Sequence, residues 1–418
     1  MNITSFLPVL ISGTGLFFII RLRAFFIIHP LRTVRILGGA LRERTARRSL
    51  CLALAGTLGV GNILGVAVGL MIGGPGMLFW LLVSAAFSAV IKYSEATLSA
   101  LSCDRGMIGV LAHASRPRAT LYAALCLALS FTMGASLQSI SLADSAAAAL
   151  GIPPPLAAAV LTAATLAVIS GGREKIATAT ELVIPIATAT YVAITLAVIF
   201  TNIYNLQAVI SSVLTAAITP RAAGGGILAC LTSTALREGF ARGILSNEAG
   251  AGTSSLAHTT SGASPVAAGL FGILEVFFDT VLLCPLTALA ILTAIPDPTT
   301  YTSAMTLVCD AVAASIGRHF LIPLLFCVAA FAYSTVICWY YYGRLCLEYL
   351  TRRHRLFYTA AFSLFIILGG ITTDLVAVCL TDLVIFPMTL ITLHILVKNA
   401  DRIAATTEKA LLPQRNSR

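Results

Sequence analysis

Two short stretches of the 418-residue sequence combine glycines with polar side chains in apolar surroundings. Residues 56–62 read Gly-Thr-Leu-Gly-Val-Gly-Asn, and residues 245–252 read Leu-Ser-Asn-Glu-Ala-Gly-Ala-Gly. Each glycine lowers helix propensity by about 1 kcal/mol, so clustered glycines permit a helix to unwind. An unwound helix offers free amides and a positive dipole end to a carboxylate, and free carbonyl groups to a cation or an ammonium group. This combination is suited to binding a zwitterion.

Close packing of helices is the competing interpretation of the glycines, because small residues let membrane helices approach one another. The polar residues among the glycines favour a binding site instead: they are Asn62, Ser246, Asn247 and Glu248. An acidic residue at bilayer depth costs at least about 2.5 kcal/mol on insertion scales, so it is rarely present without a function.

The rest of the sequence indicates which elements hold these stretches. Hydrophobic residues make up 58% of the chain and charged residues 11%, whereas a soluble globular protein has about 25% charged residues. The mean hydropathy of +0.93 also excludes a water-soluble fold. We predict an all-α membrane protein with about 11 transmembrane helices, two of them unwound at the midplane. The apolar segments cover residues 5–22, 49–72, 77–101, 119–149, 155–171, 182–203, 226–258, 265–295, 318–345, 357–373 and 375–398.

The net charge of +10 is explained by orientation in a membrane and not by binding to nucleic acid. Basic residues concentrate in alternate loops, as the positive-inside rule requires. The predicted cytoplasmic loops hold Arg32 to Arg48, Arg105 to Arg118, Arg173 with Lys175, Arg352 to Arg355, and the tail from Lys398. We therefore predict a multi-pass protein of the plasma (inner) membrane, with its N-terminus outside and its C-terminus in the cytoplasm.

An odd number of spans with termini on opposite sides suggests two inverted five-helix halves plus one extra helix. The halves would be residues 49–203 and 204–398, each opening with an interrupted helix. Residues 1–48 would form the extra helix and a basic cytoplasmic segment, and residues 399–418 a cytoplasmic tail.

Enzymatic function is not expected. The sequence has no zinc-type histidine cluster, no nucleophile elbow and no phosphate-binding glycine loop. No organic cofactor is indicated either.

Three blocks of sequence resemble the alanine or glycine:cation symporter family. They comprise Gly56 to Ile63 with Gly73 to Gly76 and Lys92 to Glu95, then Ala241 to Gly252 with Phe278 to Thr280, then Phe331 to Thr335 with Trp339 to Gly343. The resemblance implies secondary active uptake of a small neutral amino acid, alanine or glycine foremost, driven by Na+ or sometimes H+. It also implies the five-plus-five inverted repeat and alternating access in the lipid bilayer.

The resemblance also implies which residues bind the substrate. The carboxylate would contact the backbone of Gly59 and Gly61 and the side chain of Asn62. The other candidates are Gln138 from the fourth segment and Ser246 and Asn247 from the seventh.

A sodium site is predicted in the same way. Its hydroxyl ligands would be Ser334 and Thr335, joined by the carbonyl groups of Ala55, Leu58 and Phe331. Together these groups supply about five oxygens, which suits a hard cation. The alternative is that the two hydroxyls bond back to carbonyl groups of their own helix.

Other charged and aromatic residues leave several roles open. Glu275 and Asp279 are four residues apart, so they would share a helix face and form either a proton path or, through Asp279, a network with Arg242. Glu248 could hold the unwound segment through backbone hydrogen bonds. Residues 339–342 could form an aromatic belt at the membrane interface.

Two alternatives to a sodium-coupled amino-acid symporter remain from the sequence. One is a proton-coupled transporter of another small neutral solute. Val60 and Leu245 replace the threonine and the aromatic residue usual in the family, which leaves the alanine or glycine preference open. The other is an amino-acid sensor or a channel that has the same fold but does not perform cation-coupled transport. The sequence does not indicate an oligomeric state.

Overall fold

The chain is helical wherever the structure describes it. The computed structural model describes residues 7–102, 105–218, 233–260, 262–351, 353–372 and 374–411, and no strand occurs in these ranges. Six helical spans are long and apolar enough to cross a membrane, and a bent pair of helices forms a seventh. The predicted fold class, an all-α membrane protein, is confirmed, while the count of 11 spans stays a prediction.

Helices occupy the predicted apolar segments. They are α1 (Leu7–Arg21), α4 (Arg44–Thr57) with α5 (Leu64–Gly73), α6 (Met77–Ser102), α8 (Arg116–Leu129) with α9 (Leu137–Leu150), α10 (Pro154–Ile169), α11 (Gly172–Thr201), α14 (Thr234–Asn247), α15 (Pro265–Val276) with α16 (Cys284–Ala294), α18 (Leu321–Leu350), α19 (Arg355–Gly369) and α20 (Asp374–Lys398). The seventh predicted segment begins at residue 226, outside the described residues. Shorter helices connect the others: α2 (Phe25–Ile28), α3 (Pro30–Ala40), α7 (Gly106–Ala114), α12 (Leu206–Ile218), α17 (Ala304–Ile316) and α21 (Ala400–Leu411).

Helix α11 begins earlier than hydropathy predicts. Its first residue is Gly172, whereas the apolar segment was expected to begin near residue 182, so Arg173 and Lys175 lie in a helix and not in a loop. Ion pairs with α4 explain how this charged start is stabilised. Arg48 of α4 forms ion pairs with Glu174 and Glu181 of α11, each at 2.9 Å. These pairs connect the first turns of α4 to the charged start of α11.

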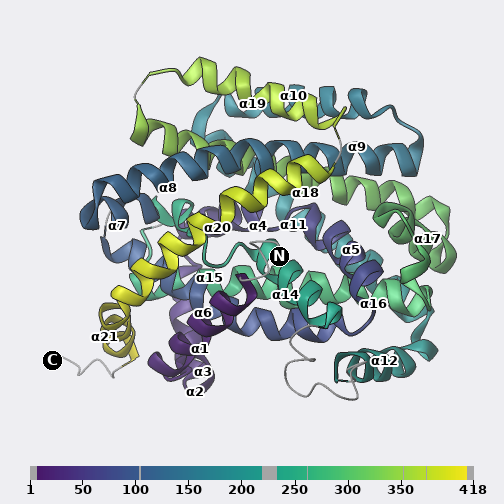
Figure 1. The fold of residues 1–418 in the computed structure, drawn as a ribbon, viewed down its shortest axis with the longest axis horizontal. Coiled ribbons are helices and arrows are strands. Elements are labelled where there is room, and N and C mark those ends of the chain that lie inside the picture. The colour runs from purple at the N-terminus through teal and green to yellow at the C-terminus, as the bar shows by residue number, and fades with distance from the viewer. Residues whose placement is uncertain are drawn as a thin grey trace.

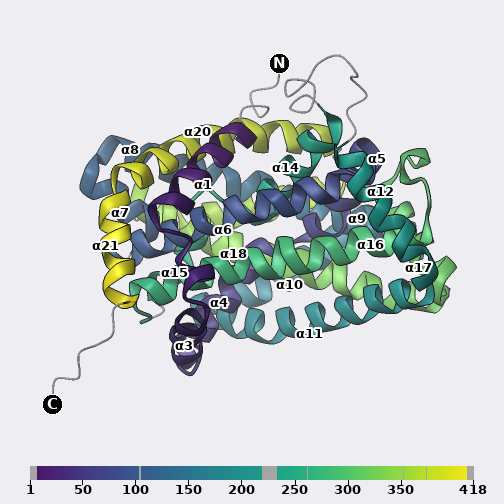
Figure 2. The ribbon, with the colours of Figure 1, turned by 90° about the horizontal axis from the view of Figure 1, so that it is seen from below.

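The long helices run between two ends of the molecule (Figures 1 and 2). Helices α7 and α21 lie at one end, on the left in both views, and α12 and α17 lie at the other end, on the right. Basic residues such as Arg116, Arg118 and Arg402 belong to the α7 and α21 end. The positive-inside rule predicts that this end faces the cytoplasm, and the orientation stays a prediction.

Helix α6 packs closely against α14 and α15 because glycines line both contacts. A methyl group added at Gly243 of α14 would collide with Ser84 of α6, and one at Gly272 of α15 would lie 2.8 Å from the carbonyl oxygen of Lys92. Small residues at such positions allow two helix backbones to approach. Polar groups of α6 are thereby brought within hydrogen-bonding distance of the segments beside α14 and α15.

The first helix, α1, lies against α6 as an addition to the remaining bundle. Gly15 of α1 contacts Phe87 of α6, and Arg21 at the end of α1 pairs with Asp401 of α21 at 2.6 Å. These contacts connect α1 to α6 and α21, and the assignment of residues 1–48 as an extra segment stays a prediction. The division of the chain into residues 49–203 and 204–398 stays a prediction.

The aromatic residues 339–342 do not form a belt at the membrane interface. All four side chains belong to α18 and are buried: Trp339, Tyr340, Tyr341 and Tyr342. Tyr340 stacks on Tyr358 of α19, with ring centroids 5.2 Å apart. The expectation was wrong because α18 packs against α4, α8, α9 and α11, which leaves this part of it without a lipid-facing side.

Candidate functional site

The first predicted interruption is a true break in a helix. Helix α4 ends at Thr57, a single short turn covers Val60–Asn62, and α5 continues at an angle of 59° to α4. Gly61 is exposed although Val60 and Asn62 beside it are buried. No atom lies within 4 Å of the position that a methyl group at Gly61 would take, so the backbone here faces open space. The backbone of Gly61 is therefore accessible to a small ligand.

The second interruption follows the end of α14 at Asn247. Glu248, Gly250 and Gly252 take positive φ angles of 55°, 91° and 74°, which stops the helix. The carboxylate of Glu95 from α6 accepts hydrogen bonds from the amides of Gly250 at 2.7 Å and Gly252 at 3.2 Å. Glu95 thus binds the backbone of the unwound segment, a role that the sequence suggested for Glu248.

Glu248 instead bonds within its own segment, where Thr253 donates to it at 2.5 Å. The carbonyl oxygen of Ala251 accepts from the hydroxyl of Tyr122 at 2.9 Å. The second break is therefore held on its amide side by α6 and on its carbonyl side by α8. It cannot close into a regular helix without losing these bonds.

The two breaks meet through Asn62 and Ser246. The hydroxyl of Ser246 lies 2.5 Å from Oδ1 of Asn62 and 2.8 Å from Oδ1 of Asp279, and its single proton can go to either oxygen. Nδ2 of Asn62 is buried and forms no hydrogen bond of ordinary length among the described residues, although the Asn62 side chain lies beside the Asp279 carboxyl group. A buried amide donor without an acceptor is costly, so this atom is a candidate contact for an anionic ligand group.

Asp279 therefore has a different partner from the one considered in the sequence analysis. Arg242 pairs with Glu238 of its own helix at 3.1 Å, whereas Asp279 accepts from Ser246 and, at 2.6 Å, from Thr280. The network between Asp279 and Arg242 is not formed. The hydroxyl group of Ser246 instead lies between the Asp279 carboxylate and the Asn62 side chain.

Gln138 reaches the first break from the opposite side. Its Oε1 accepts from the amide of Val60 at 3.4 Å. A methyl group at Gly59 would lie 3.2 Å from this oxygen and 3.2 Å from the hydroxyl oxygen of Thr335. Gly59 thus lies between a candidate substrate residue of α9 and a candidate sodium ligand of α18, where a larger residue would separate them.

Asn247 uses both ends of its amide within the protein. Its Nδ2 donates to Thr280 at 3.1 Å, and its Oδ1 accepts from the amide of Ala249 at 2.9 Å. The side chain is fully buried. These bonds cap the end of α14, so Asn247 shapes the second break, next to the Ser246 hydroxyl.

The candidate sodium ligands lie at the junction of α4 and α18. The hydroxyl of Thr335 donates to the carbonyl oxygen of Ala55 at 2.9 Å, which connects the two helices. Ser334 donates to the carbonyl oxygen of Phe331 at 3.0 Å, within α18. Leu58 follows the last turn of α4 and is buried. The Thr335 hydroxyl and the Ala55 carbonyl group are thus brought together, whereas Ser334 forms the internal bond considered as its alternative, and the sodium site stays a prediction.

Sequence reasoning missed a buried ion-pair network beside the second break. Lys92 of α6 pairs with Glu275 of α15 at 3.0 Å, and both side chains are completely buried. His258 lies 2.9 Å from the other oxygen of Glu275 and 2.9 Å from the hydroxyl of Ser49 in α4. A lysine inside an apolar helix was the available signal, because a buried charge requires a partner.

Both breaks carry polar groups, and Asn62 and Ser246 join them. This arrangement is typical of membrane transporters that bind a small solute between unwound segments. A manganese transporter from Eremococcus coleocola, solved with an aromatic bis-isothiourea substituted compound, has a similar fold. The TM-score is 0.53 at 14% sequence identity, covering 88% of this chain and 93% of that one. This likeness concerns the fold alone.

The family model "Sodium:alanine symporter family" matches residues 1–409. The sodium/alanine symporter AgcS of Methanococcus maripaludis is 32% identical over 373 residues, covering 82% of this chain and 80% of that protein. The probable sodium/glutamine symporter GlnT of Bacillus subtilis is 28% identical over 368 residues, covering 84% and 76%. The chain belongs to the sodium:alanine symporter family, a family of cation-coupled amino-acid symporters, and is an integral membrane protein.

Proposed function

We propose that this protein is a sodium-coupled symporter of small neutral amino acids, alanine and glycine foremost. It would work by alternating access in the plasma membrane, with its N-terminus outside and its C-terminus in the cytoplasm. The observation that carries the proposal is the unpartnered Nδ2 of Asn62 beside the open backbone of Gly61. These two groups offer N–H donors to one carboxylate.

The ammonium group of the substrate would be attracted to the other side of Asn62. There Ser246 and Asp279 provide oxygens, and the Asp279 carboxylate provides a negative charge in a region of low dielectric. Gln138 and the backbone of Gly59 would complete the opposite wall. In this arrangement the acid and amine groups of one small amino acid contact opposite sides of the site.

The coupling ion would bind among Ala55, Leu58, Phe331, Ser334 and Thr335. Binding would turn the hydroxyl oxygens of Ser334 and Thr335 toward Na+, in place of the hydrogen bonds that they donate to Phe331 and Ala55. Gly59 lies between the proposed sodium site and the substrate residue Gln138. Binding at either site would therefore change the backbone segment that forms part of the other. Coupling of cation and amino acid would follow from this shared segment.

The test is uptake of labelled alanine and glycine into proteoliposomes. We expect accumulation with an inward sodium gradient and little uptake with a proton gradient or with neither. Accumulation with protons alone would contradict the coupling ion. Binding of another small neutral amino acid in place of alanine or glycine would contradict the substrate, and it would direct attention to Val60 and Leu245 at the pocket wall.

Asn62→Ala and Ser246→Ala test the site itself. Each removes a charge-assisted contact to the substrate, so uptake is expected to fall at least about tenfold. Asn205→Ala and Ser170→Ala are matched controls, because both residues lie at helix ends outside the breaks. Unchanged alanine uptake in Asn62→Ala would refute the site assignment.

A further inference from the structure

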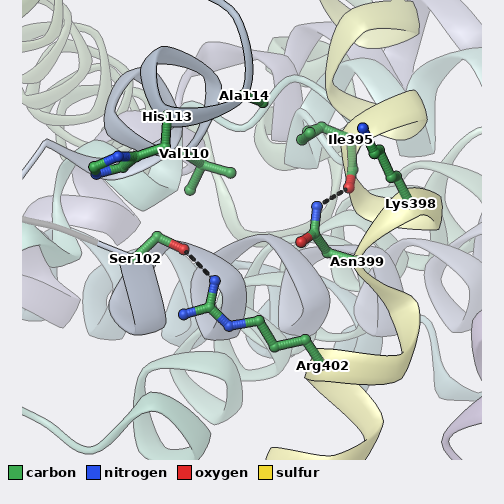
Figure 3. Close-up of a pocket in the computed structure, with 8 residues that line it drawn as sticks. All are labelled: Ser102, Val110, His113, Ala114, Ile395, Lys398, Asn399 and Arg402. Atoms are coloured by element: carbon green, nitrogen blue, oxygen red, sulfur yellow. Dashed lines mark hydrogen bonds between the residues drawn. The ribbon is translucent and has the colours of Figure 1, made fainter.

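A cavity of about 410 Å³ opens at the end of the molecule where α6, α7 and α20 meet. Its lining residues are Ser102, Val110, His113, Ala114, Ile395, Lys398, Asn399 and Arg402 (Figure 3). The cavity is separate from the two helix breaks, and none of the residues of the proposed transport site lines it.

The lining is cationic, and none of its eight residues is acidic. Arg402 reaches across to α6, where it donates to the hydroxyl of Ser102 at 3.4 Å (Figure 3). It also donates to the carbonyl group of Leu101 at 3.1 Å, so both acceptors are neutral oxygens. Lys398 takes part in none of the ion pairs found among the described residues. The positive charge of the cavity is therefore not balanced by the side chains that line it.

The acidic residue next to Arg402 does not change this balance. Asp401 is turned toward α1, where Arg21 engages its carboxylate at 2.6 Å. Asn399 donates to the carbonyl oxygen of Ile395 at 2.8 Å and keeps its own amide oxygen as an acceptor. Lys398 and the unused N–H groups of Arg402 thus remain as donors for an anion.

The floor of the cavity has a different character from its rim. Val110 and Ile395 are buried and apolar, whereas His113, Lys398 and Arg402 are exposed. A small inorganic anion would gain nothing from an apolar floor, but a phospholipid has both a phosphate and an apolar glycerol ester region. The cavity also lies at the end that carries the basic residues, which the positive-inside rule places at the anionic cytoplasmic leaflet.

We propose that this cavity binds the headgroup of an anionic phospholipid. Lys398 and Arg402 would bind the phosphodiester, and Val110 and Ile395 would contact the glycerol ester region. Bound lipid would bridge α6, α7 and the junction between α20 and α21 at the membrane surface.

Native mass spectrometry of the purified full-length chain in an uncharged detergent tests the proposal. Phosphatidylglycerol should bind more tightly than phosphatidylcholine. Each basic residue near an anionic surface contributes about fivefold in affinity, so Lys398→Gln/Arg402→Gln should weaken phosphatidylglycerol binding about 25-fold. Lys409→Gln is the matched control, because it removes one positive charge from the exposed side of α21.

Retention of phosphatidylglycerol affinity by the double variant would overturn the proposal. Displacement of the lipid by inorganic phosphate or glycerol phosphate at similar concentrations would also overturn it, in favour of a free anion. If the double variant does not fold, Lys398→Gln alone is decisive, since this side chain forms no ion pair in the described part of the chain, and a fivefold loss is expected. The unfolding temperature in phosphatidylcholine confirms that the variant is intact.

Discussion

Replacing Glu95 by alanine tests how the second unwound segment is held. The substitution removes the acceptor of two buried amides, those of Gly250 at 2.7 Å and Gly252 at 3.2 Å. A buried donor left without an acceptor costs about 1–3 kcal/mol, so the expected loss for the two amides is about 2–6 kcal/mol. That loss is a large part of the about 5–15 kcal/mol that stabilises a typical folded protein.

Two measurements separate a local effect from a global one. Hydrogen exchange should become faster at the amides of Gly250 and Gly252 before it changes at the α6 and α15 amides, and the unfolding temperature in detergent should fall. Glu95→Gln keeps a carbonyl oxygen as acceptor for the amides, so its effect should be smaller than that of Glu95→Ala. Alanine uptake should fall in both variants, because the position of Ser246 depends on this segment.

Glu348→Gln is the matched control. Glu348 pairs with Arg344 on the exposed side of α18, and surface pairs of this kind contribute at most about 1 kcal/mol. Normal exchange at Gly250 and Gly252 in Glu95→Ala, together with an unchanged unfolding temperature, would refute the idea that this carboxylate holds the break.

Three further substitutions test other parts of the structure. Gly243→Leu should separate α14 from α6 at Ser84 and destabilise the protein by at least about 1–3 kcal/mol, which thermal unfolding measures. Lys92→Met should cost about 3–5 kcal/mol because it leaves Glu275 buried without its lysine, and Lys92→Met/Glu275→Leu should recover part of the loss; no recovery would count against a direct pair. Thr335→Val keeps the side-chain shape but removes an oxygen, so the sodium concentration needed for half-maximal uptake should rise about tenfold, and an unchanged value would exclude Thr335 as a ligand.

The sequence predicted the fold class and both helix breaks because these depend on local composition. Hydropathy identifies apolar helices, and clustered glycines at 56–61 and 250–252 mark where a helix can stop. Helix ends were predicted less well where ion pairs extend a helix beyond its apolar part. The start of α11 is the clearest case, since Glu174 and Glu181 bond Arg48 of another helix.

Contacts between residues distant in sequence could not be predicted from composition or spacing. Lys92 and Glu275 are 183 positions apart, and Glu95 is 155 positions from Gly250. Spacing also gave no guide to the partners of Glu275 and Asp279, which were expected to share a helix face. A π-helical turn over Phe277–Leu283 follows α15, and the two carboxylates contact different partners, Lys92 with His258 for one and Ser246 with Thr280 for the other.

The second break is bonded by α6 and by Tyr122 of α8, whereas the first is bonded from α9 and α18, so the span formed by α8 and α9 contacts both breaks. Glu95 of α6 bonds the second break, and α6 packs tightly on α14 and α15, so these elements should move as one unit. Gln138 and Thr335 contact the first break from α9 and α18. The bond between Ser246 and Asn62 joins this unit to the first break. A substrate that binds both residues would stabilise one position of the unit relative to the first break, which is the differential interaction that alternating access requires.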